Sequence, residues 1–159
     1  MPNDGGLMAQ LEQWLADTLA LLTYGDEAKA VFKTAAVWRH QLSASKSGME
    51  AFARYEPFAF VSYQSADGAR EGDYDLRQVL EFAVLIGVKS KADGVARFGD
   101  ANHLGTSRIR DLVIAALDKT HPGGSLTCDE FYYTGEIEVF DSPKLHAIQM
   151  NFETSQITT

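Results

Sequence analysis

The segment from Leu76 to Val88 is the feature that most constrains the fold of this chain. Its residues alternate, and one of the two alternating sets contains only apolar side chains: Leu80, Phe82, Val84, Ile86 and Val88. A period of two places such a set on one face of a β-strand, and that face must be covered by other elements. The segment therefore predicts a long strand in a sheet that needs a covering layer.

Two amphipathic helices are predicted to supply that layer. Over residues 6–23 apolar side chains recur at helical spacing on one face, namely Leu7, Leu11, Trp14, Leu15, Leu19 and Leu22. Over residues 106–120 a second stripe is predicted, which contains Ile109, Leu112, Val113, Ala116 and Leu117. Thr106 or Ser107 can serve as the N-cap of this helix, and the run that begins with His121-Pro122 ends it.

Shorter patterns predict the remaining elements. Strands are expected over residues 31–38 (where a short helix is the alternative), 58–63, 131–140 and 145–152, and a brief helical turn over 49–54. Residues 58–63 and 76–88 are expected to form an antiparallel hairpin whose connection, 66–75, is a mobile loop, with a second mobile loop over 90–104 and a frayed edge over 153–159. Together these elements predict one α+β domain over residues 1–159, an antiparallel sheet with two main helices packed on one face.

The charge of the chain is unevenly distributed along its length. The net charge is −8, from 14 bases and 22 acids, which disfavours a nucleic-acid-binding protein because phosphates require surplus Lys and Arg. Residues 1–28 hold five acids and no base, residues 126–159 six acids and one base, and residues 29–125 thirteen bases and eleven acids. Acidic ends could therefore bind the basic middle of a neighbouring subunit, with these candidate contacts: Lys33, Arg39, Arg70, Lys89, Lys91 and Arg97. The simpler alternative is that the charges are scattered over the surface without a role in association. We also predict that the chain has no membrane span and no signal peptide.

No group of residues has the spacing of a known catalytic or metal site. The four histidines lack a metal-binding spacing, and no phosphate-binding loop or nucleophile elbow occurs. Cys128 is the single cysteine, so a disulfide framework is excluded, and we expect an inert, partly buried thiol and a satisfied interior or interface imidazole at His146. We therefore expect no enzymatic activity, no cofactor and no metal. The rival hypothesis is a small-molecule-binding protein or hydrolase with a pocket between sheet and helices, lined by Cys128, Tyr132, Tyr133 and His146.

Two stretches carry a resemblance to a known family: Phe32-Lys-Thr-Ala-Ala-Val-Trp38 and Phe52-Ala-Arg-Tyr-Glu-Pro-Phe-Ala-Phe-Val-Ser-Tyr63. With the order of the other elements, they make residues 7–155 similar to the phage Mu-like tail terminator (tail completion) proteins of contractile-tailed phages and prophages. The resemblance implies a non-enzymatic structural protein that caps the head-proximal end of the tail tube or sheath. It further implies a homo-oligomeric ring, expected to be hexameric, with tube, sheath and head–tail connector proteins as partners. Such a protein would be found in the bacterial host cytoplasm during assembly and then in the virion tail.

Overall fold

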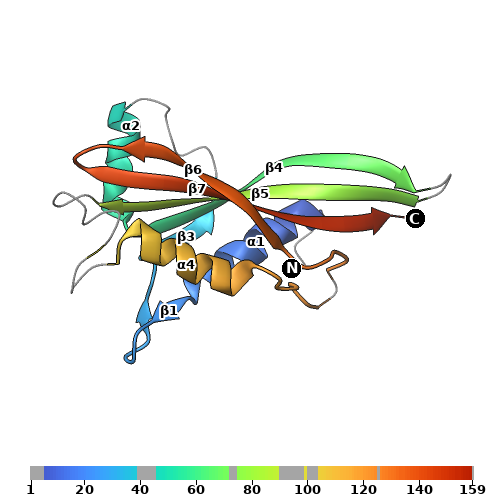
Figure 1. Cartoon of the computed structure of the whole chain (residues 1–159), viewed down its shortest axis with the longest axis horizontal. Helices are drawn as coiled ribbons and strands as arrows, with labels where there is room; N and C mark the ends of the chain where they lie inside the picture. The colour runs from blue at the N-terminus through green and yellow to red at the C-terminus, as the bar shows by residue number, and fades with distance from the viewer. Residues whose placement is uncertain are drawn as a thin grey trace.

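The computed structural model describes residues 6–38, 46–71, 75–89, 99, 104–124 and 126–158. Figure 1 shows the arrangement of the elements, which are, in chain order, α1 (Leu7–Ala20), β1 (Thr23–Tyr24), β2 (Lys29–Ala30), β3 (Thr34–Val37), α2 (Lys46–Ala51), the 3-10 helix η1 (Phe52–Tyr55), β4 (Phe58–Glu71), β5 (Asp75–Lys89), α4 (Thr106–Leu117), β6 (Tyr132–Asp141) and β7 (Leu145–Thr158). The chain is of the α+β class, as the alternation and the helical spacing predict.

Five strands form the main sheet, in the order β3-β4-β5-β7-β6. The pairs β4–β5, β5–β7 and β6–β7 are antiparallel, so the predicted antiparallel arrangement holds for these four strands. Strand β3 departs from it and runs parallel to β4. The reason is the connection, because α2 and η1 cross over between β3 and β4 and return the chain to the end of the sheet where β3 begins.

Two predictions about irregular segments are wrong. Of the expected loop over 66–75, residues 66–71 and Asp75 are strand, because β4 continues to Glu71 and β5 begins at Asp75, with a bulge between Tyr63 and Ser65. Residues 72–74 lie outside the described residues. The expected frayed edge over 153–159 is strand to Thr158, because β7 lies inside the sheet and pairs with β5 as far as Leu76. Of the predicted loop over 90–104, all but Gly99 and Leu104 lie outside the described residues.

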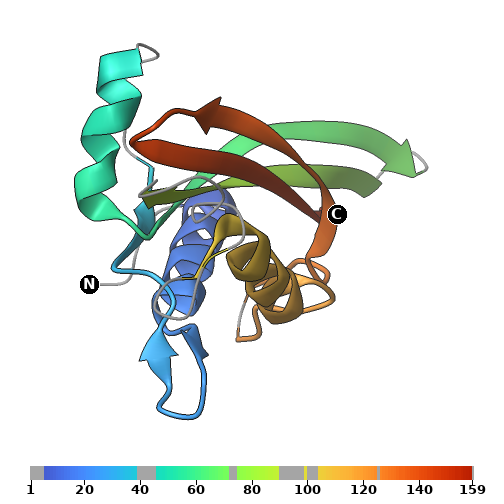
Figure 2. The same cartoon turned by 60° about the vertical axis from the view of Figure 1, so that its left-hand side comes forward.

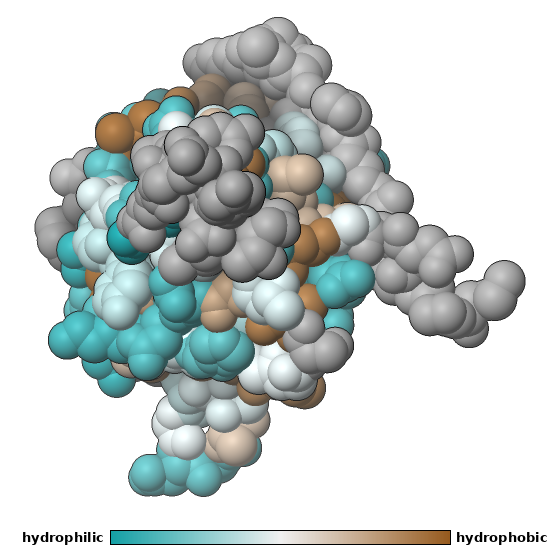
Figure 3. Space-filling view, turned by 90° about the vertical axis from the view of Figure 1, so that its right-hand side faces the viewer, coloured by the Kyte–Doolittle hydropathy of each residue, from teal (hydrophilic) through white to brown (hydrophobic). Residues whose placement is uncertain are grey.

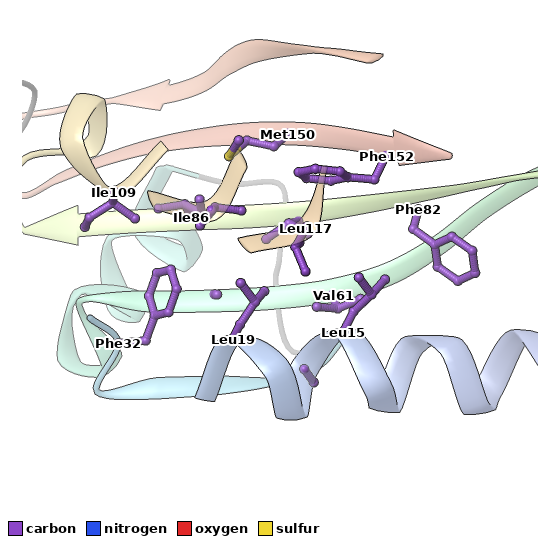
Figure 4. Packing of buried hydrophobic residues seen from close by; sticks show 14 of the residues in the cluster. Leu15, Leu19, Phe32, Val61, Phe82, Ile86, Ile109, Leu117, Met150 and Phe152 are labelled. Carbon is purple, nitrogen blue, oxygen red and sulfur yellow. The ribbon is translucent and has the colours of Figure 1, made fainter. Parts of the chain in front are cut away.

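Helices α1 and α4 pack on one face of the sheet and enclose the main hydrophobic core (Figure 4). The predicted stripes supply its helical side, since Leu11, Leu15 and Leu19 of α1 and Ile109, Val113 and Leu117 of α4 are buried. The apolar set of β5 supplies the sheet side, and all five of its members are buried. Each large apolar side chain buried here stabilises the fold by about 1.5–3 kcal/mol. Helix α4 ends at Leu117, three residues earlier than predicted.

A second, smaller core lies at one end of the opposite face. Phe52 of η1 packs there against Phe58 and Phe60 of β4 and against Leu145 of β7, with Trp38 at its edge. The rings meet mostly edge to face, with centroids 5.1–6.2 Å apart, the geometry that aromatic quadrupoles favour. Helix α2 therefore stands at this end of the sheet, apart from α1 and α4 (Figure 2).

Two parts of the chain extend beyond the layered body. The β4–β5 hairpin and the end of β7 run past α1 and α4 as a long arm (Figure 1). The short β1–β2 hairpin projects from the helical layer on the side that faces away from the sheet. The end-on view shows this projection as mostly hydrophilic (Figure 3). At the base of this hairpin, Tyr24 packs against the main core.

Candidate functional site

The face of the sheet opposite α1 and α4 carries the second core and the groove described below, and we call it the outer face. Alternation along β7 assigns its members, because Ile148, Met150 and Phe152 point into the main core and the residues between them point outward. The register then places Gln149 beside Leu85 of β5 and Ile137 of β6. The α2–η1 segment covers one end of this face, and the rest is uncovered among the described residues.

An apolar groove of about 370 Å³ occupies the middle of the outer face, beside α2. Trp38, Phe60, Leu85, Val139 and Phe140 are among its lining residues. Ile137, 58% exposed, lies on the neighbouring position of β6. Exposed large apolar side chains that adjoin an apolar groove are typical of surfaces that bind another molecule.

An acidic hollow of about 590 Å³ lies at the other end of the outer face. Three carboxylates line it, those of Asp129, Glu130 and Glu153, and Arg77 and His121 belong to the same lining. Glu81 lies directly opposite Glu153 across the β5–β7 pair, an arrangement of like charges that costs stability. The hydrogen bond to Glu130 and the charge of that carboxylate raise the pKa of Tyr132.

The opposite end of the face is basic. Lys33, Arg54 and Lys89 are exposed there, and the Lys33 Nζ atom lies 3.4 Å from the backbone oxygen of Arg54. The backbone N–H of Lys89 donates to Glu56 nearby. Lys144, 70% exposed, faces Glu50 at 3.6 Å across the start of β7.

The six basic residues expected at a subunit interface have different outcomes. The structure brings Lys33 and Lys89 to the same end of the sheet, each beside η1 or its flanking residue. Arg70 lies in the β4 arm, at the far end of the sheet, and its side chain is outside the described part. Arg39, Lys91 and Arg97 lie outside the described residues.

His146 is a buried imidazole between α4 and β6, and both of its ring nitrogens have a hydrogen-bond partner. Its Nδ1 atom is 2.9 Å from the Thr106 hydroxyl and its Nε2 atom 2.8 Å from a carboxylate oxygen of Glu138. Because a carboxylate only accepts, the neutral ring carries its proton on Nε2 and accepts the Thr106 hydroxyl proton at Nδ1. The order hydroxyl, imidazole, carboxylate is that of a hydrolytic triad, but Thr106 is 2% exposed and its oxygen cannot meet a substrate. These contacts instead fasten the first residue of α4 to the sheet.

An ion pair fastens the middle of α4 to β6. Arg110 donates to Glu136, and Tyr133 donates to the same carboxylate at 2.6 Å. The hydrogen bond with Glu136 raises the pKa of Arg110, and burial, followed by its bond to Glu136, raises that of Tyr133. Glu136 and Glu138 therefore both bind side chains of the same subunit, Glu136 those of Arg110 and Tyr133 and Glu138 that of His146.

The pocket of the rival hypothesis is not assembled. Cys128 and Tyr132 line the acidic hollow, whereas Tyr133 and His146 face α4 on the other side of the sheet. Burial raises the pKa of the Cys128 thiol, in keeping with the expected inert cysteine. Sequence reasoning did not single out Ile137, which is exposed beside the groove, or Glu153, which lines the acidic hollow. The alternation along β6 and β7 predicts that both side chains lie on the outer face, but their neighbours on the adjacent strands depend on the register.

No protein-family model matches the chain, and no curated protein matches its sequence. Among the described residues, no three His, Cys, Asp or Glu side chains are grouped as metal ligands would be. None of the described helices has the length and apolar character that a membrane crossing requires.

Proposed function

We propose that this chain is a non-enzymatic structural protein of a phage or prophage, a tail terminator that caps the head-proximal end of the tail tube or sheath. The observation that carries the proposal is the relation between the two stretches that resemble the tail terminator family. They lie side by side as the parallel pair β3–β4, with Thr34 opposite Phe58 and Val37 opposite Val61. Together they form one edge of the sheet and link its two cores.

The charge of the outer face supports a role in assembly. Acidic side chains predominate at one end of the sheet and exposed basic side chains at the other, which suits contacts between unlike surfaces of neighbouring subunits. A ring that recognises a preformed tail end would use Lys33 and Lys89 at the basic end, with Arg39, Arg70, Lys91 and Arg97 as further candidates. Exposed ion pairs contribute only about 0–1 kcal/mol each, so apolar contacts must supply most of the binding energy.

The proposal predicts a measurable effect on tail polymerisation. Tube protein of a contractile-tailed phage, polymerised with increasing amounts of this chain, should give shorter tubes, and the effect should saturate at about one ring per tube end. The double variant Lys33→Glu, Lys89→Glu should weaken capping, whereas the matched pair Lys29→Glu, Lys119→Glu, two exposed lysines away from the basic end, should not. Unchanged tube lengths for cognate tube and sheath proteins alike would refute the function.

The alternative, a small-molecule-binding protein or hydrolase, is favoured by one observation, the volume of the acidic hollow. Its carboxylates would select a cationic ligand. Thermal-shift measurements with a panel of amines and guanidines test this alternative, and it fails if no compound raises the melting temperature.

A further inference from the structure

We propose that the outer face binds the outer face of a second copy of this chain about a two-fold axis that passes close to Ile137. This contact is separate from the ring of the proposed function and goes beyond it. Three observations on the outer face carry the inference: the position of its apolar centre, the charge of its two ends, and the shape of those ends.

The apolar centre lies midway between the charged ends. Ile137 pairs with Gln149 of β7, whereas Lys89 pairs with Leu145 and Glu81 pairs with Glu153. Gln149 is four residues from each of these β7 positions, so each charged end is about 13 Å from the centre. A two-fold rotation about the centre therefore superposes the basic end of one copy on the acidic hollow of the other.

The charges are complementary in that arrangement. The basic end presents Lys33, Arg54 and Lys89, and it would lie over the acidic hollow of the second copy, where the carboxylates of Asp129, Glu130 and Glu153 outnumber the guanidinium of Arg77. The like-charge pair Glu81–Glu153 would gain Lys89 of the second copy as a nearby cation. The interaction occurs twice per pair, because a two-fold interface repeats every contact.

The shapes of the two ends are complementary as well. The α2–η1 segment stands above the sheet at the basic end (Figures 1 and 2), and the hollow of about 590 Å³ lies at the acidic end. The rotation seats the projecting segment of each copy over the hollow of the other. The apolar grooves and the two Ile137 side chains then meet at the axis, where water is excluded from both.

The size of the face sets the strength of the pair. The contact would extend about 26 Å along the strands, from the α2–η1 segment to the acidic hollow, and about 15–19 Å across them, from eight residues of β7 and four strand spacings. Each copy would bury roughly 400–500 Å², so the total is near the lower limit of specific interfaces. We therefore expect a weak, reversible dimer that high salt dissociates.

The dimer would matter for assembly, and this consequence alone rests on the proposed function. Lys33 and Lys89 are candidate contacts in both arrangements. A subunit in the face-to-face pair could not use them in a ring, so the pair would have to separate before a subunit joins the tail end.

The first test is the mass in solution. Sedimentation equilibrium from about 10 µM to about 1 mM protein should show a monomer–dimer equilibrium in about 0.05 M salt and monomer in about 1 M salt. Ile137→Asp should abolish the dimer, whereas Met8→Asp, a change of a comparably exposed apolar residue on α1, should not. A monomer at all concentrations, or growth beyond the dimer, would overturn the inference.

The second test separates a two-fold contact from a head-to-tail one. In a Cys128→Ser background, Ile137→Cys should form a disulfide-linked dimer under mild oxidation, because the residue faces its own copy at the axis. Asp111→Cys on the exposed side of α4 should not. Equal cross-linking of both variants would contradict the proposed axis.

Charge exchange gives the third test. Glu153→Lys and Lys89→Glu should each weaken the dimer about tenfold, and an equal mixture of the two variants should restore it as a mixed pair. Failure of the mixture to recover would refute the charge pairing.

A tube-capping assay distinguishes the two proposals. If the unmodified protein caps tubes but forms no dimer, the tail-terminator function stands and the face-to-face contact is refuted. If it forms the dimer but does not cap tubes, the contact stands and the tail-terminator function is refuted. The Ile137→Asp variant should cap tubes without forming the dimer.

Discussion

Gly87 of β5 is the residue at which a single methyl group should be most damaging. It lies directly opposite Phe58 of β4, whose ring lies over it in the second core. A Cβ atom at Gly87 would overlap that ring, and even the Cε2 atom would be 2.8 Å away, less than the 3.4–4 Å of ordinary contact. Phe58 is fully buried, so its ring has no free space into which it can move.

The expected cost of Gly87→Ala follows from this overlap. Overpacking a filled core costs about 1–3 kcal/mol of unfolding free energy, which lowers the melting temperature by roughly 2–4 °C per kcal/mol in a chain of this size. Gly68→Ala is the matched control, since Gly68 lies in β4 and its added methyl would meet its nearest neighbour, Leu76 Cδ1, at 3.4 Å. That change should be neutral or should stabilise the fold by up to about 1 kcal/mol, because alanine loses less backbone entropy than glycine.

Urea unfolding followed by circular dichroism measures both effects. The double variant Gly87→Ala, Phe58→Leu adds a second check, because the smaller side chain removes the overlap and the two changes should be non-additive by about 1 kcal/mol or more. Equal stability of the two alanine variants, or strict additivity in the double variant, would refute the close packing of Phe58 on Gly87.

Three further predictions concern Thr106, Tyr133 and Cys128. Thr106→Val should destabilise the fold by about 1–3 kcal/mol in urea unfolding, because it leaves the buried Nδ1 atom of His146 without a donor, whereas Thr106→Ser keeps the hydroxyl and should cost less. Burial and the bond to Glu136 raise the pKa of Tyr133, so the folded state keeps this proton longer and stability should fall as the pH rises above about 10; Tyr133→Phe should show a smaller fall. Burial also raises the pKa of Cys128, so iodoacetamide at neutral pH should alkylate it more slowly than it alkylates the unfolded chain.

The elements of the main core were predictable because their periodicity is local. The fully apolar set in residues 80–88 and the stripes of α1 and α4 each mark one face without knowledge of a partner. The arm was not predictable in this way. Residues 66–71 are small or polar, and they form strand because β5 and β7 continue the ladder beside them, a tertiary effect that overrides local preference.

The candidate site was predictable only in part, because it depends on register. Local sequence identified Lys33 and Lys89 as basic residues, but their position at one end depends on η1. Thr106 was predicted as an N-cap, yet Gly105 holds that position and the hydroxyl binds His146, forty residues away in the sequence. No local pattern relates Ile137 to Gln149, because that pairing depends on a bulge between Glu138 and Phe140 of β6.

Direct imaging of tube ends tests the central claim, that this chain acts by binding the end of a phage tail. Cognate tail tubes assembled without a terminator, mixed with the purified protein and imaged by electron cryo-microscopy, should carry a closed ring of extra density at one end of each tube. The Ile137→Asp variant should give the same ring. Bare ends at saturating protein, or density distributed along the tube walls, would contradict the account.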